Sequence, residues 1–92
     1  MSYTIWKQVV KGDTIQFPKG YEILSAKEQD GEIAIWALCN KEESIKERVT
    51  IGVFATGEIL PKDIKENYDF IDTVILQDVG LVFHVYKKLV RG

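Results

Sequence analysis

The sequence predicts an all-β fold of six or seven mainly antiparallel strands, arranged as a sandwich or a barrel-like sheet. Eleven Ile, nine Val and five Thr outnumber six Leu, four Ala and one Met. Branching at Cβ restricts side chains in helices but packs well on pleated sheets, so this imbalance favours strands. Short apolar runs also alternate with turn residues along the chain. The length of 92 residues supports a single domain spanning residues 1–92.

Seven segments have strand composition and are bounded by turn residues. The strongest hairpin signal is Asp30-Gly31, because both residue types tolerate a positive φ. Lys11-Gly12, Pro18-Lys19-Gly20 and Asp78 to Gly80 mark further turns. The predicted strands are Tyr3–Val10, Asp13–Phe17, Tyr21–Glu28, Glu32–Asn40, Glu47–Ala55, Phe70–Leu76 and Leu81–Lys88.

Two connections are longer than a hairpin turn. Residues 41–46 are polar and charge-rich, which indicates a solvated loop or one helical turn. Residues 56–67 contain Pro61 followed by acidic and basic residues, a pattern that suits one short helix. Loops of about this length are often functional. We therefore expect at most one short helix in the fold, within residues 56–67.

Composition excludes several classes of function. The 14 acidic and 12 basic side chains give a net charge of −2, which provides no general attraction to a nucleic-acid backbone. The single cysteine, Cys39, cannot form an intrachain disulfide, which suits a reducing cytoplasm. We expect no export signal and no membrane span, because the chain has no long uncharged apolar run.

Each predicted strand has one apolar face and one mixed face. Alternation assigns Val49, Ile51 and Val53 to the core, together with Leu81, Phe83 and Val85 and with Ile33, Ile35 and Cys39. Aromatic side chains, which a solvated face usually lacks, occur on the opposite faces. Three readings stay open: a ligand surface, a subunit interface, or a second small core under residues 56–67 or 40–46. The mixed faces contain Trp6, Gln8, Trp36, Arg48, Thr50, Phe54, His84 and Tyr86.

No catalytic or metal-binding motif is present in the sequence. His84 is the only histidine, and a lone strand histidine is more often a hydrogen-bonded structural residue than a catalytic base. Cys39 and His84 cannot supply the four ligands of a structural zinc site. Thr56 and Gly57 end a strand with a flexible element whose backbone N–H groups could hold an anion. We predict a binding protein without enzymatic activity, metal or cofactor.

Several short segments, in order along nearly the whole chain, resemble a family of small phage and prophage proteins that carries a domain of unknown function. The compact β outline is more loosely similar to the sponge proteins that sequester cyclic ADP-ribose signals of the Thoeris system. The segments that carry the first resemblance are Ile5-Trp6-Lys7, Pro18-Lys19-Gly20, Glu22 to Ser25, Gln29-Asp30-Gly31, Trp36-Ala37-Leu38, Ala55-Thr56-Gly57, Ile59-Leu60-Pro61 and Gly80 to Tyr86.

These resemblances imply a homo-oligomeric counter-defence protein that sequesters an immune signalling nucleotide in the cytoplasm of an infected bacterium. The signal would be of the cyclic ADP-ribose type or a cyclic oligonucleotide. An alternative is a protein that inhibits a defence effector by direct contact, and another is a minor virion or assembly component. Aromatic stacking and a few donors would hold the nucleotide. The residues expected to bind it are Trp6, Trp36, Arg48, Thr56, Gly57 and His84.

Overall fold

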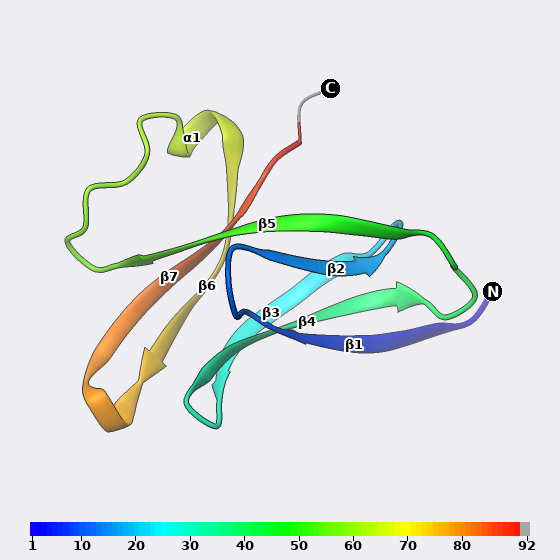
Figure 1. Cartoon of the computed structure of the whole chain (residues 1–92), viewed down its shortest axis with the longest axis horizontal. Coiled ribbons are helices and arrows are strands. Elements are labelled where there is room, and N and C mark those ends of the chain that lie inside the picture. The colour runs from blue at the N-terminus through cyan, green and yellow to red at the C-terminus, as the bar shows by residue number, and fades with distance from the viewer. Residues whose placement is uncertain (91–92) are drawn as a thin grey trace.

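The computed structural model describes residues 1–90 and contains two antiparallel sheets (Figure 1). In the three-stranded sheet A, β1 (Tyr3–Val9) pairs with β4 (Glu32–Asn40), which pairs with β3 (Glu22–Gln29). The four-stranded sheet B has the order β2 (Thr14–Pro18), β5 (Lys46–Ala55), β7 (Leu81–Lys88) and β6 (Tyr68–Leu76). Within residues 1–90 the sheets do not close into a barrel. The predicted all-β antiparallel fold is confirmed, in its sandwich form.

The predicted elements are all present, and the strand ends differ from the prediction by at most two residues. The expected short helix is α1 (Ile64–Asn67), between β5 and β6. A 3₁₀ turn, η1 (Gln77–Val79), precedes β7 and was not predicted as a helix. Asp30 has a φ of 53° and Gly31 a φ of 81°, as a tight hairpin between β3 and β4 requires.

The inner faces of the two sheets enclose one apolar core. Phe17 from sheet B and Ile35 from sheet A are both fully buried within it. The predicted core residue Leu81 is instead 47% exposed. That prediction is wrong because Leu81 pairs with Leu76 at the last position of the β6–β7 ladder, where the hairpin turns. The core contains Ile15, Phe17, Ala26, Ile33, Ile35, Ala37, Cys39, Val49, Ile51, Val74 and Val85.

The two sheets meet where β3 and β6, an edge strand of each, lie side by side (Figure 1). A bulge in β6 places Asp72 at this junction. Its carboxylate accepts a hydrogen bond from the Ala26 N–H at 3.3 Å and forms an ion pair with Lys27 at 3.0 Å. Burial raises the pKa of Asp72, but hydrogen bonds from Lys27, Ala26 and Thr73 outweigh it and lower the pKa below its ordinary value. Asp72 thus links the two sheets.

Candidate functional site

The structure brings three of the six predicted ligand-binding residues together where β5 ends, beside the middle of β7. His84 Nε2 lies 2.7 Å from Thr56 Oγ1, and His84 Nδ1 lies 3.1 Å from Thr73 Oγ1. A neutral imidazole has one donor and one acceptor nitrogen, and hydroxyl groups can satisfy both. Gly57 follows Thr56 with a φ of 89°. His84 therefore has the hydrogen-bonded structural arrangement that its position on a strand favours.

An aromatic cluster lies beside His84 on the outer face of sheet B, the face turned away from the core. Phe54, Tyr68, Phe70 and Tyr86 form this cluster, with ring centroids 5.4 to 6.5 Å apart in edge-to-face geometry. Gly52 makes room for it: a Cβ there would lie 2.8 Å from the Phe54 ring. The four rings pack on one another as in a small second core, although Phe70, on the edge strand β6, is 55% exposed.

The two indoles do not share a surface, and the predicted placement of Trp6 on a mixed face away from the core is wrong. Trp6 pairs with Ala37 across the β1–β4 ladder and packs against the core, with Lys46 Nζ 5.3 Å from its ring centroid. Trp36 pairs with Lys7 and lies on the outer face of sheet A. The strand register explains this difference. The two side chains of a cross-strand pair lie on the same face of the sheet, and successive pairs alternate between the two faces. Trp6 with Ala37 and Lys7 with Trp36 are successive pairs. Trp6 and Trp36 therefore cannot contact one small ligand together in this chain.

The sixth predicted residue, Arg48, lines a hollow of about 380 Å³. The hollow forms because the β5–β7 ladder ends at the pair Ile51 and Lys87. Beyond that point the Leu89 N–H donates to the carbonyl of Asn67, just before β6. The chain after β7 therefore stays beside β6 and moves away from the first half of β5. The residues that line this basic hollow are Tyr21, Glu47, Arg48, Val49, Lys87, Lys88, Leu89 and Val90.

Positive charge dominates the basic hollow, with Arg48, Lys87 and Lys88 against Glu47. The Glu47 carboxylate accepts a hydrogen bond from the Gly20 N–H at 3.4 Å. In the described part of the chain, Arg48 is exposed and takes part in none of the ion pairs. A chain with a net charge of −2 thus concentrates three cations around one concave surface. Such a surface attracts anions.

Tyr21 fixes the position of one of these cations. Lys87 Nζ lies 4.7 Å from the centroid of the Tyr21 ring, a cation–π distance. The ring in turn packs on Phe17, with centroids 5.5 Å apart, and Phe17 is fully buried. A chain of contacts therefore runs from the core to Lys87. Tyr21 and Lys87 also line a second hollow of about 320 Å³, next to Phe70 and Asp69.

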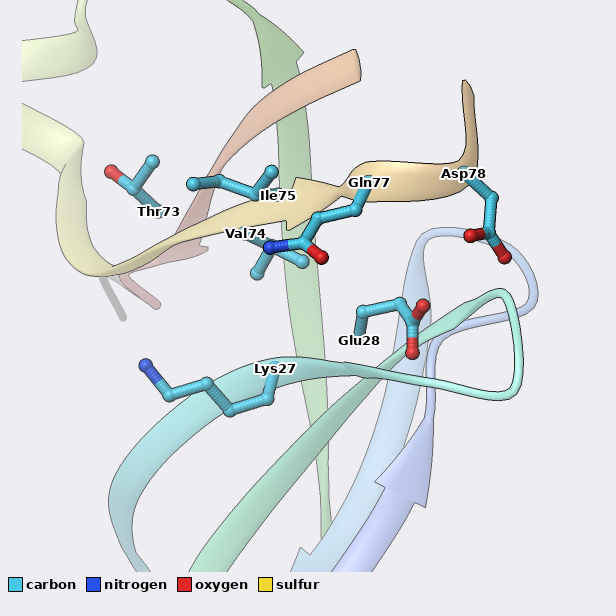
Figure 2. Close-up of a pocket in the computed structure, with 7 residues that line it drawn as sticks. All are labelled: Lys27, Glu28, Thr73, Val74, Ile75, Gln77 and Asp78. Atoms are coloured by element: carbon cyan, nitrogen blue, oxygen red, sulfur yellow. The ribbon is translucent and has the colours of Figure 1, made fainter. Parts of the chain in front are cut away.

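A third hollow, of about 410 Å³, lies along the junction of β3 and β6 (Figure 2). Glu28 extends into it from β3, and Gln77 and Asp78 border it on the side of β6 and η1. Its one cation, Lys27, already forms the ion pair with Asp72. Among residues 1–90, the carboxylates of Glu28 and Asp78 take part in no ion pair, and negative charge beside a neutralised lysine disfavours an anion here. The sign of the charge thus separates this hollow from the basic one.

Sequence reasoning missed Tyr21, Lys87 and Lys88 as site residues. From the sequence alone, Lys87 and Lys88 form with Arg91 a short basic cluster that favours a role in solubility and edge protection. Arg91 lies outside the described residues. The adjacent pair of lysines was the available signal. Its proximity to Arg48 could not be foreseen, because it depends on the pairing of β5 with β7 and on where that ladder ends.

Residues 1–90 contain neither a cluster of metal ligands nor an exposed cysteine. In this part of the chain no group of three or more His, Cys, Asp or Glu side chains could hold a metal ion. Cys39 is buried, which raises the pKa of its thiol despite a hydrogen bond from the Trp6 backbone. No helix among these residues has the length and apolar character needed to cross a bilayer.

A family model described as a domain of unknown function, DUF7352, matches residues 1–91. The chain belongs to this family. Its description assigns no activity to its members. No curated protein and no solved structure matches the chain. Evidence for a function therefore has to come from the site itself.

Proposed function

We propose that this DUF7352 chain is a binding protein for a phosphate-bearing small molecule, and that the ligand occupies the basic hollow beside Arg48. The observation that carries the proposal is the grouping of Arg48, Lys87 and Lys88 around one concave surface. Its volume of about 380 Å³ falls in the range of small-molecule sites.

Each lining side chain has a distinct role in this proposal. The Arg48 guanidinium donates two parallel hydrogen bonds to phosphate oxygens, a geometry that a lysine cannot reproduce. Lys87, held on the Tyr21 ring at 4.7 Å, and Lys88 supply further positive charge. The apolar side chains of Leu89 and Val90 give the rest of the ligand a surface to contact.

A nucleotide is the class of ligand that we propose, and sequestration is the role. The three cations of the basic hollow suit holding the phosphate groups of such a ligand. The sequence resemblance suggests the role in the cell that we propose. The protein would capture an immune signal, of the cyclic ADP-ribose type or a cyclic oligonucleotide, in a phage-infected bacterium.

Calorimetric titration tests the proposal. The titrants are a cyclic ADP-ribose isomer, a cyclic dinucleotide, a mononucleotide and inorganic phosphate, each at two salt concentrations. We expect a nucleotide to bind more tightly than phosphate, and its affinity to fall as salt screens the three cations. Heating the complex should release the ligand intact, as chromatography with mass detection would show.

Variants of Arg48 connect the binding to the hollow. Arg48→Ala should weaken the nucleotide about tenfold or more, and Arg48→Lys should recover only part of this loss because it restores charge without the bidentate geometry. Lys62→Ala, an exposed cation in the loop before α1, is the matched control and should bind normally. The proposal fails if none of the nucleotides binds, if Arg48→Ala binds like the parent, or if a transformed product is released.

A further inference from the structure

The outer face of sheet A, the side turned away from the core, carries exposed apolar side chains. Tyr3 is 60% exposed and Ile5 is 58% exposed, both on β1. Across the ladder, Ile5 pairs with Leu38 and Lys7 pairs with Trp36, so all four side chains project from the same face. Leu24, in the bulge of β3, is 47% exposed. Side chains of this kind are usually covered when they occur together on a sheet.

Among residues 1–90, two charges on this face that take part in no ion pair, those of Lys7 and Glu22, lie diagonally opposite each other. Lys27 and Glu32, on the same face, already form ion pairs with Asp72 and Lys11. Glu22 on β3 pairs with Leu38, on the side of the face opposite Ile5. Lys7 on β1 pairs with Trp36, one row further along and at the other edge of the sheet. The acid and the base therefore lie on opposite sides of a centre formed by Leu38 and Trp36. A two-fold axis through that centre, in the plane of the face and perpendicular to the line from Lys7 to Glu22, exchanges the two positions.

We propose that this face binds the same face of a second copy of the chain. In such a pair, Lys7 of each copy meets Glu22 of the other, and the apolar centres pack between the two ion pairs. The face is thus complementary to itself, as a two-fold interface requires. Face-to-face packing of two sheets is also an ordinary way to bury apolar strand faces. An unrelated partner would not need this diagonal arrangement of charge.

The pairing involves a modest rearrangement and a small interface. Lys7 Nζ now donates to Gln29 Oε1 at 2.6 Å, an exposed hydrogen bond that the flexible lysine can exchange for Glu22 of the second copy. A three-stranded sheet offers an area at the low end of specific interfaces. We therefore expect a reversible dimer with a dissociation constant in the micromolar range, about 1 to 100 μM.

Sedimentation equilibrium on the full chain tests the dimer. Lys7→Glu and Glu22→Lys each place like charges together at both symmetric contacts, and each should weaken association about tenfold or more. The double variant Lys7→Glu/Glu22→Lys restores opposite charges and should restore the dimer. Lys62→Glu, outside the face, is the control for changed net charge and should leave association unchanged.

Two outcomes would overturn the proposed dimer. A parent chain that stays monomeric up to about 1 mM overturns the proposal. So does a double variant that associates no better than the single ones, because that outcome would assign the effect to something other than pairing of Lys7 with Glu22. Far-UV circular dichroism of each variant shows whether the sheet is intact. Phosphate binding at the basic hollow is independent of this outcome, because Arg48, Lys87 and Lys88 belong to sheet B.

Discussion

The outer faces of the two sheets contain similar kinds of side chain but use them differently. On sheet B, Phe54, Tyr68, Phe70 and Tyr86 contact one another in the aromatic cluster. Phe70, on the edge strand β6, is nevertheless 55% exposed, close to Tyr3 at 60% and Ile5 at 58% on sheet A, where the described outer side chains form no ring pair. Aromatic content alone therefore does not identify a docking surface. What separates the two faces is whether neighbouring strands bring the side chains into contact with one another.

The absence of a side chain at Gly52 contributes to this difference. In sheet B, Gly52 pairs with Tyr86 and has no side chain, so the Phe54 ring lies over the strand and reaches its neighbours. In sheet A, the central strand β4 presents Trp36 and Leu38 to the outer face, between the side chains of β1 and β3. One missing side chain thus lets four rings gather on sheet B.

The largest effect that we predict comes from the aromatic cluster. Tyr86 contacts three other rings, so Tyr86→Ala should lower the free energy of unfolding by about 2–4 kcal/mol, through lost burial and lost ring contacts. Chemical denaturation measures this loss. Tyr3→Ala on sheet A is the matched control and should cost under about 0.5 kcal/mol. Equal losses in the two variants would remove the distinction between the faces.

A second prediction concerns Asp72, which holds the two sheets together. Asp72→Asn removes the charge that pairs with Lys27, and should lower the free energy of unfolding by about 1–3 kcal/mol at neutral pH. The variant Glu28→Gln, which neutralises an exposed carboxylate on the neighbouring strand, is the control. A loss confined to Asp72→Asn would show that the contact, and not net charge, joins the sheets.

The pH dependence gives the same prediction a second readout. The folded-state pKa of Asp72 lies below the ordinary value of 3.8, so its stabilisation is present above that value. It is lost as the pH falls through 3.8 toward the lower folded-state pKa. Denaturation measured from about pH 6 down to pH 2 should therefore show a steeper decline for the parent chain than for Asp72→Asn. Parallel declines would contradict this account.

A smaller effect should follow from filling the space at Gly52. A Cβ there would lie 2.8 Å from two carbons of the Phe54 ring, so the ring has to move and Gly52→Ala should cost about 1–2 kcal/mol. In a double-mutant cycle with Phe54→Leu, which removes those ring carbons, the cost of the alanine should shrink. Additive losses would mean that the Phe54 ring is not the obstacle.

Strand positions could be predicted from the sequence because turn chemistry and apolar alternation are local properties. Asp30-Gly31 fixed one hairpin, and the alternation in Glu32–Asn40 correctly separated buried Ile35 and Cys39 from Trp36. Which faces become neighbours is a different matter, because it depends on pairing between distant strands. The mixed-face residues Trp6 and Trp36 belong to adjacent strands whose register turns them to opposite sides.

The candidate site shows the same limit. Arg48 was identified from the sequence by its chemistry, since a guanidinium on a mixed face suits an anion. Its partners Lys87 and Lys88 lie about forty residues further along the chain, and only the β5–β7 ladder brings them close. The hollow exists because that ladder ends early, and no local pattern in the sequence encodes its end.

The smallest change in stability should come from Ile5→Ser on sheet A, and this variant separates folding from association. Ile5 is 58% exposed, so its loss should lower the free energy of unfolding of the monomer by no more than about 0.5 kcal/mol. The same substitution places a hydroxyl in the apolar centre of the proposed dimer and should weaken association measurably in sedimentation. In the aromatic cluster, by contrast, Tyr86→Ala should lower the free energy of unfolding because it removes side-chain surface that is covered within the single chain. If Ile5→Ser destabilised the dilute monomer as strongly as Tyr86→Ala, the outer face of sheet A would be part of the core of a single chain, and no second copy would be needed to cover it.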